Sequence, residues 1–310
     1  MMARSMNEFL SGELLLNESL ARYTTWRVGG PADRMYKPAG LSDLIAFVKN
    51  LPADEPLFWL GLGSNLLVRD GGIRGTVIAT QGALKEMTLD GDDRVRVEAG
   101  VTCAKVARFC NQHVLVGAEF LAGIPGTMGG AIAMNAGAFG SETWNLIDEI
   151  ETIDRSGQLH RRKPAEFTVG YRSVVGLKDE WFVAASLRLE RVGEEQQTAI
   201  KQKSRDLLAQ RNKKQPIGQA SCGSVFRNPE GGYAAQLIEK TGLKELCVGG
   251  ACVSAKHANF IINTGSATAQ DIETLINKVS DAVNEAQGIR LVREARIVGE
   301  YKLSGVPESK

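Results

Sequence analysis

The stretch from Leu121 to Gly140, LAGIPGTMGGAIAMNAGAFG, constrains the fold of this chain more than any other feature. It contains six glycines and no charged side chain, whereas a surface linker usually carries Ser, Lys and Glu as well. Glycine adopts positive φ and lets the backbone come within contact distance of a flat or anionic ligand. Successive N–H groups in such a turn form an anion-binding concavity. Two interpretations follow: a loop that holds a ligand, or a tightly packed buried crossing of the chain.

A second glycine-rich loop, Gly61-Leu62-Gly63-Ser64-Asn65-Leu66, lies between two apolar stretches that we expect to be strands. It begins like the dinucleotide fingerprint G-x-G-x-x-G, but Leu66 occupies the place of the third glycine. A β-type stretch follows it instead of a helix, so the context of a Rossmann site is missing. Two uncharged glycine loops in one chain favour a single large cofactor that carries phosphate.

Periodicity predicts most of the remaining elements and a division into domains. A chain of 310 residues is long enough for two or three domains. The predicted helices cover 42–50, a segment after Thr102, 198–211, 234–241 and a segment from Thr268 to Gly288; the predicted strands cover 75–79, 94–99, 147–153, 182–189 and a run within 248–263. A polar break and Pro216 after residue 211 mark a boundary. The expected domains are therefore 1–82, 83–211 and 212–310.

Capping signals and the two ends complete this outline. Ser42 and Thr102 are expected helix caps, and Thr268 with Asp271 resembles a capping box worth about 1 kcal/mol. We expect residues 1–20 to be a short, partly disordered lead-in and the tail after Tyr301 to be frayed.

Composition excludes several functions. A formal net charge of +1 argues against a general nucleic-acid binder. The apolar runs are shorter than a membrane span, and the first residues, with Glu8 and Glu13, lack a signal-peptide core, so we expect a cytoplasmic protein. Five cysteines without a C-x-x-C pair favour reduced thiols, and Cys103 and Cys110 should share a buried helix face. The three histidines are scattered, so we expect no metal site.

The two glycine loops also carry a family resemblance. GLGSNLLV followed by FLAGIPGTMGGAIAMNAGAFG closely resembles the UDP-N-acetylenolpyruvoylglucosamine reductase family. The resemblance extends to TTWRVGG from Thr24, Gly170-Tyr171-Arg172, GSVFRNP from Gly223 and LVRE from Leu291, in the expected order over about residues 15 to 300. The segment between Phe182 and Ser224 is short and has no long insertion. In this respect the chain resembles the subclass of the family that lacks an extra tyrosine-bearing loop.

The resemblance implies a fold, a reaction and partners. The fold class is α+β: a two-part FAD-binding region of the p-cresol methylhydroxylase/vanillyl-alcohol oxidase type, followed by a C-terminal α+β substrate-binding domain. The implied reaction is NADPH-dependent reduction of UDP-N-acetylglucosamine enolpyruvate to UDP-N-acetylmuramate, for bacterial cell walls. His113 and His160 lie outside the glycine loops, so we expect non-covalent FAD. The implied partners are small molecules, with neither nucleic acid nor membrane, and the protein is expected to be a monomer.

Three residues match the family's catalytic set by resemblance. Ser224 would donate a proton to the intermediate, Arg172 would bind the developing enolate or the substrate carboxylate, and Glu294 would polarise the same region. Without the resemblance, the sequence favours Ser224 as a turn serine that bonds its own backbone, and Glu294 is also compatible with an outward-facing strand residue. The familiar pattern continues Y-R-x-S, whereas here Ser173 follows Arg172 directly, which leaves a supporting role for that serine in doubt.

The same resemblance assigns contacts with the cofactor and the substrate. The expected FAD contacts lie in the two glycine loops: Gly61, Leu62, Gly63, Ser64, Asn65, Leu66, Gly123, Ile124, Pro125, Gly126, Thr127, Gly129, Gly130, Asn135, Ala136 and Gly137. The expected substrate contacts are Tyr171, Arg227, Asn228 and His257.

Two other functions stay open at this point. A related flavin oxidase would use the same cofactor loops on an alcohol or hydroxy acid, and a catalytically dead regulator would keep the loops but lose Arg172, Ser224 and Glu294. The presence of all three residues favours the reductase.

Overall fold

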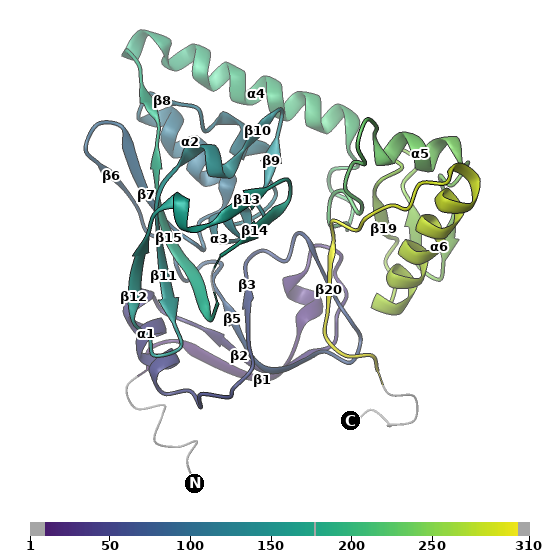
Figure 1. Cartoon of the computed structure of the whole chain (residues 1–310), viewed down its shortest axis with the longest axis horizontal. Coiled ribbons are helices and arrows are strands. Elements are labelled where there is room, and N and C mark those ends of the chain that lie inside the picture. The colour runs from purple at the N-terminus through teal and green to yellow at the C-terminus, as the bar shows by residue number, and fades with distance from the viewer. Residues whose placement is uncertain (1–9, 177, 303–310) are drawn as a thin grey trace. The chain divides into compact units, whose positions relative to one another are not determined.

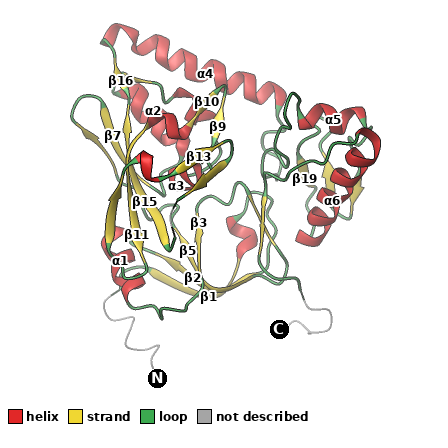
Figure 2. Cartoon of the chain, in the orientation of Figure 1, coloured by secondary structure: helices red, strands yellow, loops and turns green. Residues whose placement is uncertain are grey.

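A computed structural model describes residues 10–176 and 178–302 of the chain (Figure 1). The chain divides into two compact units. Unit 1 comprises residues 1–15, 35–62 and 77–211, and unit 2 comprises 16–34, 63–76 and 212–310. Both units mix helices and strands (Figure 2). The expected disordered start falls partly on residues 1–9, and the expected frayed tail mostly on 303–310, which lie outside the described residues.

The main sheet of unit 1 has five antiparallel strands in the order β12-β11-β15-β7-β6. Their bounds are β6 Met87–Asp90, β7 Arg94–Glu98, β11 Ile147–Asp154, β12 Leu159–Arg162 and β15 Glu180–Arg188. Alternation of apolar residues places one face inward: Val97 pairs with Ala185, Ala185 with Ile150, and all three are fully buried. Helices α2 (Cys103–Gln112) and α3 (Met128–Ala133) contribute to the same core.

A second sheet has the strand order β1-β2-β5-β3. Its strands are β1 Glu13–Ser19, β2 Pro31–Lys37, β3 Leu57–Leu60 and β5 Ile73–Ala79, with helix α1 (Leu41–Lys49) between β2 and β3. The division into units passes through β1, β2 and β5, so each of these strands begins in one unit and ends in the other. The prediction of a lead-in over residues 1–20 was therefore wrong for Glu13–Ser19, where a strand forms.

Unit 2 holds a three-stranded antiparallel sheet, β17-β18-β19, and two helices. The bounds are β17 Cys247–Val248, β18 Ala251–Val253, β19 Ile261–Asn263, α5 Ala234–Lys240 and α6 Ala269–Gln287. Thr268 accepts a hydrogen bond from the Asp271 N–H, which confirms the predicted capping box, and Gly288 ends α6 with φ of 69°. Buried Ile272, Leu275 and Ile276 of α6 join the core of this unit. In the same unit, β4 (Leu66–Val68) pairs in parallel with β20 (Arg296–Val298).

The remaining elements include three short antiparallel strand pairs and one long helix. Two of the pairs are hairpins, β9 Gly137–Ala138 with β10 Ser141–Glu142 and β13 Thr168–Gly170 with β14 Ser173–Val175. The third joins strands distant in sequence, β8 Leu115–Val116 and β16 Glu190–Arg191. Helix α4 spans Gln197–Lys214 and so continues three residues past the predicted end at residue 211.

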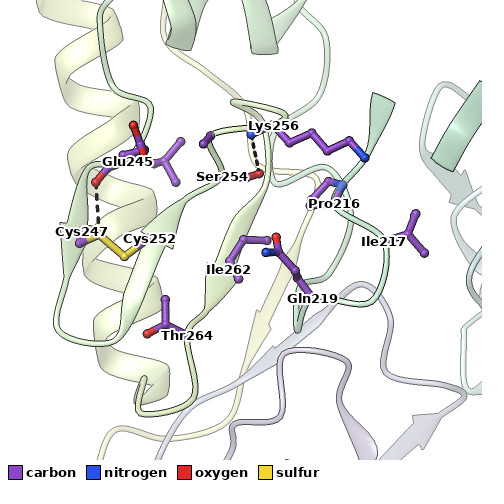
Figure 3. Close-up of a pocket in the computed structure, with 12 residues that line it drawn as sticks. Pro216, Ile217, Gln219, Glu245, Cys247, Cys252, Ser254, Lys256, Ile262 and Thr264 are labelled. Carbon is purple, nitrogen blue, oxygen red and sulfur yellow. Dashed lines mark hydrogen bonds between the residues drawn. A yellow bond between two sulfur atoms is a disulfide. The ribbon is translucent and has the colours of Figure 1, made fainter. Parts of the chain in front are cut away.

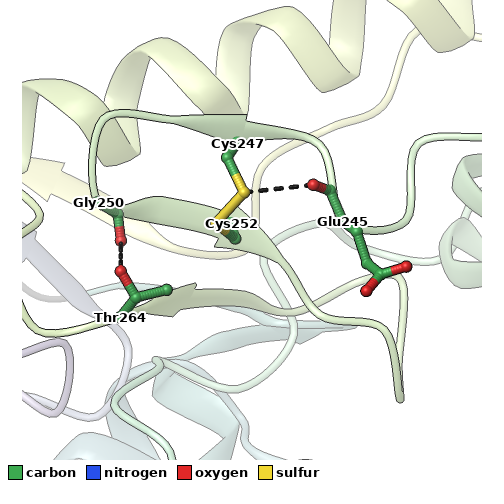
Figure 4. Close-up of a disulfide and its surroundings, with 5 residues drawn as sticks. All are labelled: Glu245, Cys247, Gly250, Cys252 and Thr264. Atoms are coloured by element: carbon green, nitrogen blue, oxygen red, sulfur yellow. Dashed lines mark hydrogen bonds between the residues drawn. A yellow bond between two sulfur atoms is a disulfide. The ribbon is translucent and has the colours of Figure 1, made fainter.

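One capping prediction and one cysteine prediction were wrong. Gly40, not Ser42, is the N-cap of α1. Thr102 is the N-cap of α2, as predicted, but its side chain makes no capping hydrogen bond. Cys247 and Cys252 form a disulfide, although five cysteines suggested reduced thiols (Figure 4). The two residues face each other across the β17–β18 pair, which brings their side chains together. Cys103 and Cys110 are free and buried, as predicted.

Candidate active site

The first glycine loop is shaped by the protein's own backbone. Gly63 has φ of 64°, and a Cβ there would overlap the carbonyl oxygen of Tyr23, while the Thr25 N–H donates to the Gly63 carbonyl at 3.2 Å. A Cβ on Gly61 would overlap the Thr127 hydroxyl. Both glycines are therefore needed for close packing, whatever else the loop binds.

The end of the same loop supports the strand that follows Glu294. The Asn65 side chain donates to the Glu294 carbonyl at 3.1 Å, and the Asn65 carbonyl accepts from the Arg296 N–H at 3.0 Å. Leu66 then pairs with Arg296 at the start of β4. Asn65 and Leu66, both predicted FAD contacts, therefore also fix the backbone on either side of Ala295.

The second glycine stretch is folded rather than extended, since it contains the short helix α3 and strand β9. Two of its glycines fill tight places: a Cβ on Gly123 would overlap the Phe139 ring, and one on Gly129 would lie 2.8 Å from the Ala99 Cβ. Gly130 differs, because it is exposed and its nearest neighbour, the Thr127 hydroxyl, would lie 3.7 Å from a Cβ. The stretch thus combines tightly packed glycines with an exposed one, and ligand binding stays a prediction for the exposed side.

Within this stretch, the hydroxyl of Thr127 has the features of a ligand-binding group. The residue is 1% exposed, and its hydroxyl oxygen is buried without a hydrogen-bond partner in the described part of the chain. It precedes α3 but makes no capping bond. A buried hydroxyl without a partner costs about 1–3 kcal/mol, so a ligand oxygen beside it would remove that cost. Together with the open Gly130, this fits a phosphate-bearing cofactor such as FAD.

Asn135, another predicted FAD contact, uses its side chain within the protein. Its amide donates to Glu142 at 2.8 Å and to the Gly170 carbonyl at 3.2 Å, and its oxygen accepts from the Trp144 N–H. The residue has φ of 45° and is 1% exposed. The side chain of Asn135 is therefore used within the protein, where it ties the glycine stretch to the β13–β14 hairpin.

Arg172 lies at the two-residue turn of that hairpin, since Gly170 pairs with Ser173. Its φ of 53° belongs to the left-handed region, and its guanidinium donates to the carbonyls of Asn135 and Gly137 at 3.3 and 3.0 Å. Tyr171 beside it is 47% exposed, with its ring 5.2 Å from the guanidinium carbon. The fold of unit 1 therefore brings the predicted catalytic arginine onto the predicted cofactor stretch.

Ser224 and Glu294 meet within unit 2 through neighbouring backbone stretches. The Val225 carbonyl accepts from the N–H groups of Glu294 and Ala295 at 2.8 and 3.2 Å, and the Arg227 N–H donates to the Val292 carbonyl at 2.8 Å. Burial, together with the Glu294 charge, raises the pKa of the Cys222 thiol well above its usual value. The backbone of Glu294 is therefore paired with the residue that directly follows Ser224.

The two remaining predicted substrate contacts also lie in unit 2. The Asn228 side-chain oxygen accepts from the Ala234 N–H at 3.2 Å, just before α5. The ring of His257 lies against Phe260 at 4.7 Å, and its Nδ1 accepts from the Asn259 N–H at 3.3 Å. Burial lowers the pKa of His257, and the positive charge of Lys244 lowers it further. Both the lowered pKa and the acceptor role of Nδ1 favour the neutral form of His257.

A cavity of about 640 Å³ lies elsewhere in unit 2 (Figure 3). Pro216, Ile217, Ile262 and the Cys247–Cys252 disulfide supply its apolar wall, and Ser254 and Lys256 are among its polar residues. Its lining includes none of the predicted site residues. The described residues contain no group of His, Cys, Asp or Glu arranged to hold a metal ion, and no helix among them is long and apolar enough to cross a membrane.

Asn259 is the residue that sequence reasoning missed. It is 3% exposed and hydrogen-bonds the segment that carries Ser224. The only signal in the sequence is a polar amide directly before the apolar run Phe260-Ile261-Ile262.

Comparisons with known proteins agree on one family. Residues 215–298 match the family model of the UDP-N-acetylenolpyruvoylglucosamine reductase C-terminal domain, and residues 32–162 match an FAD binding domain. The UDP-N-acetylenolpyruvoylglucosamine reductase of Alkalilimnicola ehrlichii is 60% identical over 93% of this chain and 96% of its own length. The enzyme of the same name from Coxiella burnetii is 51% identical over 94% of this chain and 97% of its own. A crystal structure of the Thermus caldophilus reductase matches with a TM-score of 0.78 and 31% identity, over 93% of this chain and 99% of that one.

Proposed function

This chain belongs to the UDP-N-acetylenolpyruvoylglucosamine reductase family, and from this premise we propose how its own residues divide the reaction. It is an FAD-dependent oxidoreductase that reduces UDP-N-acetylglucosamine enolpyruvate to UDP-N-acetylmuramate with NADPH, in peptidoglycan precursor synthesis. When bound, FAD supplies the hydride chemistry between NADPH and the enolpyruvyl double bond. The predicted α+β combination of an FAD-binding region with a C-terminal domain of this family is confirmed. The two-part, vanillyl-alcohol oxidase type of that FAD-binding region stays a proposal.

The observation that carries the assignment of roles is the backbone pairing of Val225, the residue after Ser224, with Glu294. Hydride addition to one carbon of the double bond requires a proton on its neighbour, and negative charge builds beside the substrate carboxylate in between. Ser224 would supply that proton. A serine hydroxyl is a weak acid, so it serves only against a strongly basic acceptor from which water is excluded. Glu294, held next to the Ser224 segment by the Val225 carbonyl, would polarise the same region.

Arg172 would stabilise the developing enolate with its planar fork of N–H donors. Two of its donors already hold the Asn135 and Gly137 carbonyls, which fixes the guanidinium in one orientation. A pre-oriented cation needs little reorganisation when charge develops. Tyr171, Arg227, Asn228 and His257 would hold the substrate.

The cofactor would lie along the second glycine stretch and the first loop, without a covalent bond. Thr127 would donate its hydroxyl to a cofactor oxygen, and Gly130 would leave room for the approach. In this proposal residues 1–82 and 83–211 bind FAD, and residues 212–310 bind the UDP-sugar. The two matched family models support that division of labour.

A Ser224→Ala variant tests the proton-donor role through the two half-reactions. Stopped-flow absorbance of the flavin should show reduction by NADPH at a near-normal rate. Re-oxidation by UDP-N-acetylglucosamine enolpyruvate should slow by roughly 10²- to 10⁴-fold, the range typical of a lost general acid. Ser224→Cys should keep partial activity, because a thiol donates from nearly the same place. Equal slowing of both half-reactions, or normal re-oxidation in the alanine variant, would remove Ser224 from this role.

We also propose that the enzyme works as a monomer in the cytoplasm, on small molecules and without nucleic acid or membrane. The near-zero net charge of +1 supports this, since it provides no strong attraction for nucleic acid or acidic lipids. Light scattering at micromolar concentration should give the mass of one chain, and a stable dimer peak would contradict the proposal. Cell fractionation that placed the protein in the membrane pellet would contradict the assigned compartment.

A further inference from the structure

The segment that carries Ser224 is held from two sides, and one of them is a single asparagine. On one side lie the backbone bonds to residues 292–295 described above. On the other side the Val225 N–H donates to the Asn259 carbonyl at 2.9 Å. The Phe226 N–H donates to Asn259 Oδ1 at 2.9 Å, and Asn259 Nδ2 donates to the Phe226 carbonyl at 2.8 Å.

Asn259 therefore takes the place of a neighbouring strand. Its side-chain amide pairs with both backbone groups of Phe226, as a peptide group would, while its own carbonyl binds Val225. Asn259 is 3% exposed and Phe226 is 1% exposed. Because these groups are shielded from water, loss of the amide would leave two backbone groups of Phe226 buried without partners, which is strongly unfavourable.

Gly223 precedes Ser224 with φ of 81°, and no atom lies within 4 Å of the position that a Cβ would take there. The contacts on both sides of Val225 and Phe226 hold the backbone that directly follows Ser224.

Asn259 is itself held in one conformation by the loop 254–260. The Ser254 N–H donates to the Phe260 carbonyl at 2.8 Å, and the Phe260 N–H donates to the His257 carbonyl at 3.0 Å. The Ser254 hydroxyl accepts from the Lys256 and His257 N–H groups, and His257 Nδ1 accepts from the Asn259 N–H. A support that is itself rigid holds a reacting group more accurately than a mobile one.

We propose that Asn259 is a positioning residue, which sets the Ser224 hydroxyl where it delivers the proton. The inference rests on the proposed role of Ser224 as proton donor. The proposal predicts that loss of Asn259 slows only the half-reaction that includes the proton transfer. It also predicts that this effect depends on Ser224.

An Asn259→Ala variant, measured alone and together with Ser224→Ala, tests both predictions. Reduction of the flavin by NADPH should stay near the wild-type rate, while re-oxidation by the enolpyruvyl substrate slows roughly 100-fold, as a misplaced reacting group does. In the Ser224→Ala background, Asn259→Ala should slow re-oxidation no further. If both changes slow re-oxidation independently, or if Asn259→Ala slows the two half-reactions equally, the positioning role is wrong. If Ser224→Ala alone leaves re-oxidation normal, the proton-donor assignment itself has failed.

Asn259→Asp keeps the shape of the side chain and provides a second readout should the alanine variant fold poorly. A carboxylate accepts from the Phe226 N–H but repels the Phe226 carbonyl, whereas a protonated carboxyl restores both bonds. The re-oxidation defect of Asn259→Asp, relative to wild type at each pH, should therefore shrink as the pH falls. A defect that is constant with pH would contradict the amide-pairing argument.

Asn263→Ala is the matched control. Asn263 is the last residue of β19, the strand that follows the Asn259 loop, and it makes a similar set of bonds. Its Nδ2 donates to the Trp26 carbonyl, and its Oδ1 accepts from the Gly265 and Ala267 N–H groups. It does not contact the Ser224 segment by any of these bonds. Its loss should lower the melting temperature without slowing re-oxidation selectively, and a selective slowing would show that any lost amide in this unit produces the effect.

Discussion

The two glycine-rich loops both lack charged residues but need their glycines for different reasons. In the first loop, Gly63 combines a left-handed backbone with direct contact against Tyr23. In the second, only Gly140 of the six glycines has positive φ, and Gly130 faces open space. The first loop is thus required by the packing of the chain, whereas part of the second leaves room for a ligand. Glycine content alone does not distinguish the two cases, but substitutions do.

The largest effect is expected at Gly63. In Gly63→Ala the new Cβ would overlap the Tyr23 carbonyl oxygen at a position that already has φ of 64°, so the backbone must move. We expect a loss of at least about 3 kcal/mol in the free energy of unfolding, measured by urea denaturation of the FAD-free protein.

Gly82→Ala is the matched control, because Gly82 has φ of 78° but no atom within 4 Å of a Cβ. It should cost only the conformational strain, about 1–2 kcal/mol. If the two variants lose equal stability, the contact with Tyr23 is unimportant and the first loop is not a packing crossing.

Thr127→Val should weaken FAD binding without lowering the stability of the FAD-free protein. The valine has nearly the same shape but lacks the buried hydroxyl, which has no protein partner. The FAD-free protein should keep or slightly gain stability, since the cost of that hydroxyl disappears. FAD affinity, measured by flavin fluorescence, should fall about tenfold or more, because a hydrogen bond to a charged oxygen is lost. A destabilised FAD-free protein with unchanged affinity would mean that the hydroxyl serves the fold.

A smaller effect is expected at Gly130, where a substitution should again weaken FAD binding without lowering stability. Gly130→Ala places a methyl group at an exposed position of α3, 3.7 Å from the Thr127 hydroxyl, and should stabilise the FAD-free protein by about 0.5–1 kcal/mol. The same methyl group should weaken FAD binding, because it occupies the side that we assign to the cofactor. Gly129→Ala provides the contrast, since its Cβ would press on Ala99 and lower stability instead. Unchanged affinity in Gly130→Ala would place the cofactor elsewhere.

Local patterns predicted the elements that depend on local physics. The capping box at Thr268 and the alternation over 94–98 involve neighbours in sequence, and both are observed. The features that were missed depend on partners far along the chain. Asn259 binds residues 33 positions away, and the Cys247–Cys252 disulfide follows from the register of β17 against β18. Strand β1 was missed because Glu13–Ser19 shows mostly exposed side chains and no inward face.

The same reasoning explains how far the candidate site could be predicted. The cofactor loops were visible because glycine is distinctive, and Arg172, Ser224 and Glu294 because they match a family pattern. Nothing in the sequence indicated that the Asn135 amide would be used by Glu142 and Gly170. Nor did it indicate which glycines pack and which are open, since that depends on Tyr23, Ala99 and Phe139.

The smallest effect is expected at Gly140, which sharpens the comparison within the second stretch. Phe139 and Gly140 are the two central residues of the β9–β10 turn, with φ of 54° and 82°, and Ala138 pairs with Ser141 across it. Both positions in such a turn need left-handed backbone, which asparagine tolerates better than other residues with a side chain. Gly140→Asn should therefore cost only about 0.5 kcal/mol in the free energy of unfolding, seen as a small shift of the urea midpoint. Since no atom lies within 4 Å of a Cβ there, no clash adds to this cost.

FAD affinity should not change in Gly140→Asn, because the glycine is needed for the turn and the residue is not among the predicted cofactor contacts. A loss of affinity at unchanged stability would extend the ligand-binding side to the end of the stretch, and the contrast between its turn glycine and its open glycine would disappear.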